Sequence, residues 1–398
     1  MAPGPPLHVL VLSWNYPTPA APHRGLWVRR MCDAAAAAGA HVSVIVPTPW
    51  VPPLVPIPAI ARFRKVPETA SDGRVTAYFP RVAGSIEYYT HGIDARLADA
   101  AVRRLAQRLH RDNPVNVIHA HFIYPDGVVA SRIGRDLGVP VMTSEHAFWR
   151  PWLADQPRVA AQVDEAVPHI RLVAPVSEFL REDVADYLGG RARTAVVPNV
   201  VDDAVFFPAA RERDPNEVLY VGLIRKFKRV DVLLRAIDIV RRSVPDVRLR
   251  ILSANAFRAY GRDRREVRDL IARLRLEPAI TFVDGADPPA VAEAMRRCAV
   301  VAVSSTRRET FCSVAAEALA CGTPLAITRC GGPEEFVTPA DGVMVDADRP
   351  EELARAIVEV LARRASFDPA DLHARIVGRF GRAAWAARTL ETYRGLRT

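Results

Sequence analysis

Short runs of apolar, often β-branched residues alternate along the chain with longer amphipathic segments. In the first half, such runs predict strands at 7–14, 41–47, 75–80, 116–121, 139–144, 171–176 and 194–199. The amphipathic segments between them predict helices at 26–38, 93–111, 127–137, 157–168 and 177–188. Six prolines between Pro47 and Pro58 interrupt the alternation and predict a long surface loop.

The alternation restarts after a weakly patterned segment, residues 202–216, which we interpret as a linker. Strands are predicted at 217–222, 247–252, 279–283, 299–304, 324–328 and 342–345, and helices at 230–243, 261–275, 287–297, 311–321 and 350–364. Such alternation is typical of parallel sheets covered by helices on both faces, with ligands at the carboxyl ends of the strands. The sequence therefore predicts an α/β fold of two Rossmann-like domains facing across a cleft, residues 1–205 and 206–370.

Composition excludes several classes of protein. With 398 residues, 49% of them hydrophobic, the chain can fill two cores and is neither mostly disordered nor a small disulfide scaffold. The net charge of +9 is spread over both halves, which disfavours a nucleic-acid partner. Four arginines of one predicted helix leave weak peripheral contact with an anionic membrane open: Arg103, Arg104, Arg108 and Arg111.

The cysteines and the hydropathy pattern indicate the cellular compartment in which we expect the protein. Five cysteines without a C-x-x-C pair favour reduced thiols and no metal site. No apolar run approaches the roughly 20 residues that cross a bilayer. We therefore expect a cytoplasmic protein, with any membrane contact at the inner face.

Two glutamates and a helix start form the first candidate site. Glu309 and Glu317 stand eight positions apart around the start of the predicted helix 311–321. Free amides in the first turn of a helix favour the binding of a phosphate. We predict that the free amides of this helix are those of Phe311, Cys312, Ser313 and Val314. The alternative is an ordinary helix with one solvated glutamate, although a buried Glu317 would need a partner.

The second candidate site is a cationic loop that follows the strand at 217–222. Gly222 allows a tight turn, and the loop then carries four cations: Arg225, Lys226, Lys228 and Arg229. Only three lysines occur in the chain, and two of them lie here. A cationic loop at this end of a strand can neutralise a pyrophosphate, although an ordinary basic loop remains the alternative.

A third group lies in the N-terminal half. His119 and His121 alternate along the strand 116–121, and we predict that they face opposite sides of the sheet. A histidine at the end of a strand, followed by Asp126, is a candidate for an acceptor site or a hydrogen-bonded structural residue. Trp149 and Trp152 either stack on a sugar or cover the core.

Taken in order, these motifs resemble family 4 retaining glycosyltransferases, which have the GT-B architecture. In the second half the resemblance lies in Gly222 to Lys228, E-T-F-C-S-V-A-A-E (309–317), A-C-G-T-P (320–324) and G-G-P-E-E (331–335). In the first half it lies in Y-P-T-P-A-A-P-H-R-G (16–25), H-A-H-F-I-Y-P-D-G (119–127), T-S-E-H (143–146) and P-N-V-V-D (198–202). It implies an N-terminal acceptor domain, a C-terminal donor domain, and helices at 371–398 that return to the N-terminal domain.

The resemblance also implies roles for residues. Glu309 would contact the donor sugar, Glu317 the ribose, Lys228 the diphosphate, and the Gly25 backbone the phosphate. We predict Glu309, Lys228 and His121 as catalytic, and Tyr16, Asp126 and His146 at the acceptor. The donor site would also include Gly222, Arg225 and the amides named above. The family uses neither a metal nor a cofactor.

Three departures from the family pattern stand out. Leu223 occupies the usual position of a phosphate-binding arginine, which Arg225 would replace. Ser253-Ala254-Asn255 stands where a G-x-G step is common, and Glu145-His146-Ala147-Phe148 stands for H-G-x-D.

These features predict an enzyme that moves a sugar from a UDP-, GDP- or ADP-sugar to a hydroxyl of a glycan, lipid-linked or small-molecule acceptor, with retention of configuration. The alternatives are a catalytically silent sugar-nucleotide-binding module and a GT-B epimerase or phosphorylase.

Overall fold

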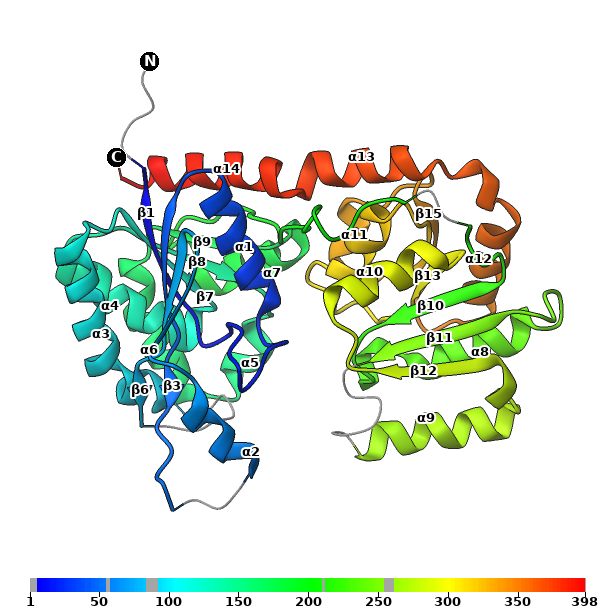
Figure 1. Ribbon diagram of the computed structural model, residues 1–398, viewed down its shortest axis with the longest axis horizontal. Helices are drawn as coiled ribbons and strands as arrows, with labels where there is room; N and C mark the ends of the chain where they lie inside the picture. Colours follow the sequence, from blue (N-terminus) through cyan, green and yellow to red (C-terminus); the bar gives the residue numbers. More distant parts are fainter. Residues whose placement is uncertain (1–5, 55–57, 84–91, 210–211, 254–260, 398) are drawn as a thin grey trace. The chain divides into compact units, whose positions relative to one another are not determined.

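The computed structural model describes residues 6–54, 58–83, 92–209, 212–253 and 261–397 (Figure 1). The chain divides into two compact units. Unit 1 comprises residues 1–200 and 383–398, and unit 2 comprises residues 201–382. The division falls a few residues before the predicted 205/206 boundary.

Unit 1 is built on a sheet of seven strands in the order β4-β5-β2-β1-β7-β8-β9. Its strands are β1 (His8–Leu12), β2 (His41–Ile45), β4 (Thr69–Asp72), β5 (Val75–Tyr78), β7 (Val117–His121), β8 (Val141–Glu145) and β9 (Leu172–Pro175). All neighbours pair in parallel except β4, which runs antiparallel to β5 at the edge. The chain order reverses between β1 and β7, which makes this the switch point of a Rossmann-type sheet.

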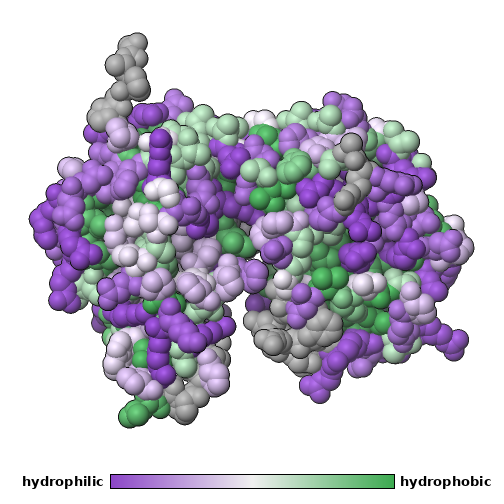
Figure 2. Space-filling model, viewed as in Figure 1, coloured by the Kyte–Doolittle hydropathy of each residue, from purple (hydrophilic) through white to green (hydrophobic). Residues whose placement is uncertain are grey.

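Helices cover the sheet of unit 1. They are α1 (Leu26–Ala37), α2 (Pro58–Ala61), α3 (Asp94–Asp112), α4 (Val128–Leu137), α5 (Arg150–Ala154), α6 (Pro157–Ala166), α7 (Glu178–Leu188) and α14 (Arg382–Gly395). Apolar residues of α1 and α14 share one buried cluster with β1 and β2, whereas α4 contacts β7 and β8. On the face shown in Figure 2 the surface is mostly hydrophilic, as expected when apolar side chains fill this core.

Two predictions for unit 1 are wrong. The segment 194–199 forms no strand, and only Thr194 makes an isolated bridge to Val173. The proline-rich stretch is not wholly irregular, because β3 (Thr48–Pro49) pairs with β6 (Arg81–Val82) in a small second sheet.

Unit 2 contains six parallel strands in the order β12-β11-β10-β13-β14-β15. They are β10 (Glu217–Val221), β11 (Arg248–Ser253), β12 (Ile280–Asp284), β13 (Val300–Val303), β14 (Leu325–Thr328) and β15 (Gly342–Val345). All four residues of β13 are apolar and buried, as expected for a strand covered on both faces. Its switch point lies between β10 and β13.

The helices of unit 2 are α8 (Val230–Val240), α9 (Gly261–Leu274), α10 (Pro288–Arg297), α11 (Ser313–Ala320), α12 (Pro350–Ala362) and α13 (Pro369–Phe380). Helix α8 packs against α12 and α9, and α11 packs against α10 and α13. The segment predicted to return to the N-terminal domain began at residue 371. Helix α13 instead belongs to unit 2, and unit 1 receives the chain only from Ala383 onward.

Candidate functional site

The switch point of unit 2 joins two loops. Ser304, directly after β13, donates a hydrogen bond to the Lys228 carbonyl at 2.8 Å. The backbone N–H of Thr306 donates to the Phe227 carbonyl, also at 2.8 Å. The cationic loop after β10 is thereby fixed to the loop that leads into α11, although the two are about 80 residues apart in the sequence.

These loops bring Lys228 and Glu309 together. The Lys228 ammonium lies 2.6 Å from Glu309 Oε1, and the Ser305 hydroxyl donates to the same oxygen at 2.6 Å. Both charged side chains are largely buried, with 19% and 9% of their surface exposed. Burial lowers the pKa of Lys228, but the charge and hydrogen bond of Glu309 outweigh it, so the net shift is upward. Lys228 is therefore a fixed cation at this edge of the sheet.

Backbone contacts position Glu309. Its N–H donates to the Cys330 carbonyl at 2.9 Å, and its carbonyl accepts from Gly332 at 2.8 Å. A Cβ on Gly332 would lie 2.4 Å from the Thr310 carbonyl oxygen, so only glycine permits this approach. The G-G-P-E-E segment thus holds the carboxylate in place.

Helix α11 begins two residues later than predicted. Cys312 is its N-cap, in a left-handed conformation (φ 63°), and no side chain caps the helix. Phe311 precedes the helix, and its ring packs 5.5 Å from Phe336 and 5.2 Å from Phe380. The first-turn amides are therefore those of Ser313 and Val314, together with Ala315, which bonds back to the Cys312 carbonyl. Glu317 is buried one turn into α11.

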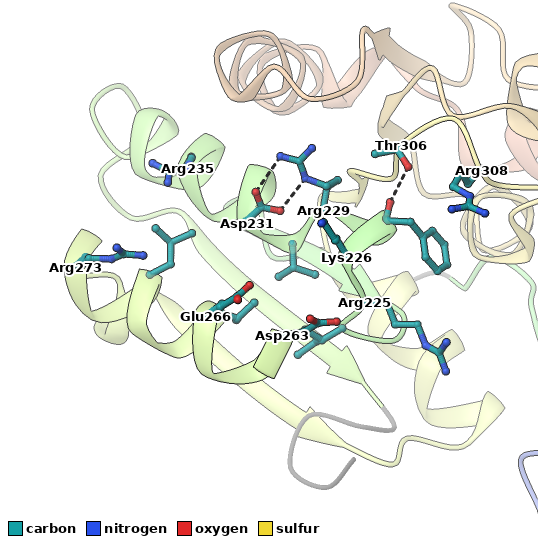
Figure 3. Close-up of a pocket in the computed structure, with 15 residues that line it drawn as sticks. Arg225, Lys226, Arg229, Asp231, Arg235, Asp263, Glu266, Arg273, Thr306 and Arg308 are labelled. Carbon is teal, nitrogen blue, oxygen red and sulfur yellow. Dashed lines mark hydrogen bonds and ion pairs between the residues drawn. The ribbon is translucent and has the colours of Figure 1, made fainter. Parts of the chain in front are cut away.

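The other predicted residues of the loop after β10 have different surroundings from Lys228. Gly222 has φ 154°, and a Cβ there would lie 3.1 Å from the Tyr220 hydroxyl. Leu223, at the position of the family's arginine, is an exposed hydrophobic residue. Arg225 and Lys226 line a pocket beside α8 and α9 (Figure 3). The structure thus separates the two lysines, and only Lys228 contacts Glu309. The predicted Ser253-Ala254-Asn255 step extends outside the described residues.

The switch point of unit 1 carries three histidines. His119 and His121 lie on the same side of β7, with ring centroids 4.4 Å apart, so the predicted opposite orientation is wrong. Residues two positions apart on a strand share a face. His119 is a structural residue, because its ring nitrogens contact the Tyr393 hydroxyl at 2.7 Å and the Ser144 hydroxyl at 2.8 Å.

His121 is better placed for chemistry. It ends β7, and its Nδ1 lies 3.2 Å from Nε2 of His146. Its Nε2 is buried and has no hydrogen-bond partner within the described part of the chain. Burial lowers the pKa of His121, and the neighbouring histidines lower it further. The pKa of His146 falls to about 3, first through burial and then through His119. Both rings are therefore neutral near pH 7.

Two buried carboxyl groups lie near these histidines. Asp126 accepts a hydrogen bond from the Trp14 N–H at 2.9 Å, and Glu145 accepts one from the Trp149 indole at 2.7 Å. Burial raises the pKa of Asp126 and brings that of Glu145 to about 8. Trp149 is thus a buried structural residue.

Tyr16 lies in the loop after β1, and Gly25 at the end of that loop is the N-cap of α1. Gly25 has φ 62°, and a Cβ there would lie 2.1 Å from the Asn15 carbonyl oxygen. The absence of a side chain therefore serves a close backbone approach within unit 1. Tyr16 is buried and lines a separate pocket that also contains Arg29 and Asp72.

Sequence reasoning missed Ser305 as part of the site. The S-S-T-R-R run after the strand at 299–304 was the available signal, but the sequence does not show which serine faces Glu309. It also missed the indole of Trp27, whose ring centroid lies 5.9 Å from that of His146.

Comparisons with known proteins show the family of the chain. A family model described as Glycosyltransferase Family 4 matches residues 25–205, and one described as Glycosyl transferases group 1 matches residues 202–376. A D-inositol 3-phosphate glycosyltransferase of Thermobispora bispora is 31% identical over 315 residues, 72% of each chain. One of Geodermatophilus obscurus is 32% identical over 290 residues, 67% of this chain and 63% of the relative.

Solved structures share the fold. Sucrose-phosphate synthase from Thermosynechococcus elongatus superposes with a TM-score of 0.76 at 20% identity, covering 98% of this chain and 99% of the other. Anabaena HepE in complex with UDP and glucose gives 0.70 at 18% identity, covering 96% and 98%. The two Rossmann-like units have the GT-B architecture of these glycosyltransferases. The chain belongs to the family 4 glycosyltransferases.

Within the described residues, no helix is both long and apolar enough to cross a membrane. All five cysteines are buried and unpaired. Burial raises the pKa of the Cys312 thiol beside the site to about 12, so it is protonated at neutral pH.

Proposed function

We propose that this glycosyltransferase moves a sugar from a nucleoside diphosphate sugar to a hydroxyl group of its acceptor, with retention of configuration and without a metal. The observation that carries the proposal is the Lys228–Glu309 pair beside the start of α11, at the switch point of unit 2. A fixed ammonium and free helix amides both favour a diphosphate.

Each group has a role in this proposal. Lys228 and the amides of Ser313 and Val314 bind the diphosphate and stabilise the charge that develops on it as it leaves. Glu309, held by Ser305, accepts hydrogen bonds from the donor sugar. The diphosphate competes with Glu309 for the Lys228 ammonium. Glu317 binds the ribose hydroxyls. His121, Asp126 and His146 contribute to the acceptor side.

In this proposal Lys228 and the helix amides neutralise the leaving diphosphate, the role that a metal ion plays in other transferases. The acceptor hydroxyl attacks from the face that the diphosphate leaves, and a phosphate oxygen takes its proton. The Anabaena HepE complexes contain UDP and UDP-glucose, which makes UDP-sugars the first donors to test. The names of the D-inositol 3-phosphate glycosyltransferases make inositol phosphates the first acceptors to test.

The test is turnover with UDP-, GDP- and ADP-sugars, followed for Lys228→Met and Glu309→Gln. We expect each variant to lose transfer by about 100-fold or more, because each removes a group that acts on the reacting diphosphate or sugar. Lys65→Met removes an exposed lysine of unit 1 and is the matched control. Full turnover in both site variants would refute the assignment. An α-configured product and activity in EDTA are expected from an α-linked donor.

One observation favours a second function, a catalytically silent binding module. Leu223 leaves the loop without the arginine that the family uses on phosphate. A wild-type chain that binds the nucleotide but transfers no sugar with any donor would support the module.

A further inference from the structure

A pocket of about 1150 Å³ lies in unit 2 between α8, α9 and the loop after β10 (Figure 3). Its polar lining contains six cations and three carboxylates: Arg225, Lys226, Arg229, Arg235, Arg273, Arg308, Asp231, Asp263 and Glu266. The lining side chains therefore carry a net charge of about +3 at neutral pH. The cations come from four separate segments and converge on one pocket.

Most of these cations are not neutralised by neighbours. Arg229 is paired, since it binds Asp231 at 3.0 Å and also contacts Asp348. The side chains of Lys226, Arg235, Arg273 and Arg308 make no hydrogen bond or ion pair with any residue of the described ranges. Figure 3 shows Lys226 over the middle of the pocket, Arg235 and Arg273 toward one end, and Arg308 at the other.

The pocket also has an apolar floor. Ile224, Val230, Val267 and Leu270 line it and are buried. A solvated basic surface has no need of such a floor, whereas a ligand with an organic body and charged groups contacts both. Guanidinium and ammonium groups together match phosphate oxygens, and arginine does so with two parallel hydrogen bonds.

We propose that this pocket binds a phosphorylated small molecule, with its phosphate on Lys226 over the middle of the pocket and its organic body on the apolar floor toward Arg273. The site differs from the donor site. The Lys228 ammonium turns to Glu309, while Lys226 faces the pocket. Phe227 separates the two, because its ring lines the pocket and lies 5.3 Å from the Lys228 ammonium. The site lies outside the donor and acceptor groups of the proposed function.

The experiment is calorimetric titration of the full chain with glucose 6-phosphate, with inorganic phosphate and glucose as partial probes. We expect glucose 6-phosphate to bind more tightly than phosphate, and glucose not to bind at concentrations up to about 10 mM. The double variant Lys226→Ala/Arg273→Ala removes two of the unpaired cations that line the pocket and should weaken binding by about tenfold or more. Asp263→Asn removes a repelling carboxylate and should tighten it several-fold.

Two further variants separate the alternatives. Arg268→Ala removes an exposed arginine of α9 outside the pocket and should leave binding within about twofold of wild type. Lys228→Met should also leave it unchanged, while transfer is lost. Undetectable binding of glucose 6-phosphate at about 10 mM overturns the proposal. So does an unchanged affinity in the double variant, or a loss of binding in Lys228→Met. Thermal melting of each variant confirms that it is folded, and transfer assays report on the proposed function separately.

Discussion

A single carboxylate oxygen, Oε1 of Glu309, receives hydrogen bonds from both Ser305 and Lys228. When a diphosphate draws the Lys228 ammonium away, the Ser305 hydroxyl is the one of these two donors that remains on Glu309. Ser305→Ala should therefore lower kcat/KM by about tenfold, the value of one hydrogen bond to a charged group. Steady-state kinetics with the preferred donor measure the effect.

The matched control is Ser366→Ala, which removes an exposed hydroxyl that donates to the Arg363 carbonyl at 2.7 Å. We expect wild-type kinetics from it. An unaltered kcat/KM in Ser305→Ala would show that Lys228 alone holds the carboxylate.

Leu223 offers a gain-of-function test at the same scale. Its side chain is 38% exposed, so an arginine there can reach solvent without a large desolvation cost. If the diphosphate lies along this loop, Leu223→Arg should lower the donor KM several-fold. Leu223→Gln, of similar size but uncharged, should not. Equal donor KM values in both variants would place the diphosphate elsewhere.

Site residues were easier to predict from the sequence where the motif also indicated the backbone geometry around them. Lys228 and Glu309 were predicted separately, from a cationic loop, a helix start and the family resemblance. The structure brings them together because both follow strands that flank a switch point, where loops from distant segments meet. The shared face of His119 and His121 follows from the two-residue period of a strand, so that error was avoidable from the sequence. The burial of Phe311 depends on Phe336 and Phe380, which pack against it from distant segments.

At the scale of elements, Arg213 joins the ends of two helices. Its guanidinium donates to Met295 and Cys298 carbonyls at the end of α10, and to Cys321 and Gly322 carbonyls after α11. Terminal carbonyls lack partners within their own helix, and a cation also suits the negative end of the helix dipole. Arg213 therefore fixes the helix that carries Glu317.

Arg213→Ala should lower the free energy of unfolding of unit 2 by roughly 2–4 kcal/mol, because four carbonyls lose a largely buried cation. Urea unfolding followed by far-UV circular dichroism measures the loss. Arg363→Ala removes an exposed arginine paired within α12, and we expect a change of less than about 1 kcal/mol. Equal stabilities of the two variants would contradict the capping role.

Elements with a strong period were predictable, and those that depend on partners were not. The parallel strands of both sheets lie within a few residues of their predicted ranges, since buried parallel strands are continuous apolar runs. The exposed antiparallel edge strand β4 was not predicted. The segment 194–199 has the same composition but contains Pro198. The Ala195 and Val197 N–H groups donate to the Val173 and Pro175 carbonyls of β9, but these contacts do not extend into a strand ladder. The Arg213 contacts join residues 82 to 110 positions apart and leave no local signal.

At the scale of unit 1, buried ionisable groups predict how stability varies with pH. The pKa values of His8, His119 and His146 fall from 6.5 to about 4, 3 and 3, mainly through burial. The unfolded chain then binds more protons than the folded one below pH 6.5, so stability falls on acidification. Burial raises the pKa of Glu145 from 4.5 to about 8, so the folded state holds an extra proton in that range and stability falls as pH rises toward 8.

We therefore expect maximal stability near pH 6.5, measured as the urea midpoint across the range from about 5 to 8. Glu145→Gln keeps the neutral form and should remove much of the decline above pH 6.5. It should also steepen the rise in stability between pH 5 and 6.5, because the proton held by Glu145 opposes the histidines there. A midpoint that rises steadily to pH 8 in the wild type would contradict the buried, protonated Glu145.

The chain begins and ends in unit 1, and its last helix completes that unit's core. Trp385, Leu390, Tyr393 and Leu396 belong to the buried cluster shared with α1 and β1. The Trp385 indole donates to the Pro198 carbonyl at 2.8 Å, and the Tyr393 hydroxyl contacts His119 at 2.7 Å. Four such side chains contribute roughly 6–12 kcal/mol by burial, comparable to the total stability of a domain.

Deletion of residues 383–398 should therefore unfold unit 1 and leave unit 2 folded, because α13 and the six-stranded sheet remain intact. Limited proteolysis should degrade the first 200 residues and spare a fragment beginning near residue 201. Deleting only the last two residues keeps all four buried side chains and should give wild-type resistance. A peptide of residues 383–398, added in excess, should restore protection of unit 1, since it returns the apolar surface that the core lacks. A truncated chain as resistant as wild type would show that unit 1 closes its core without the returning helix.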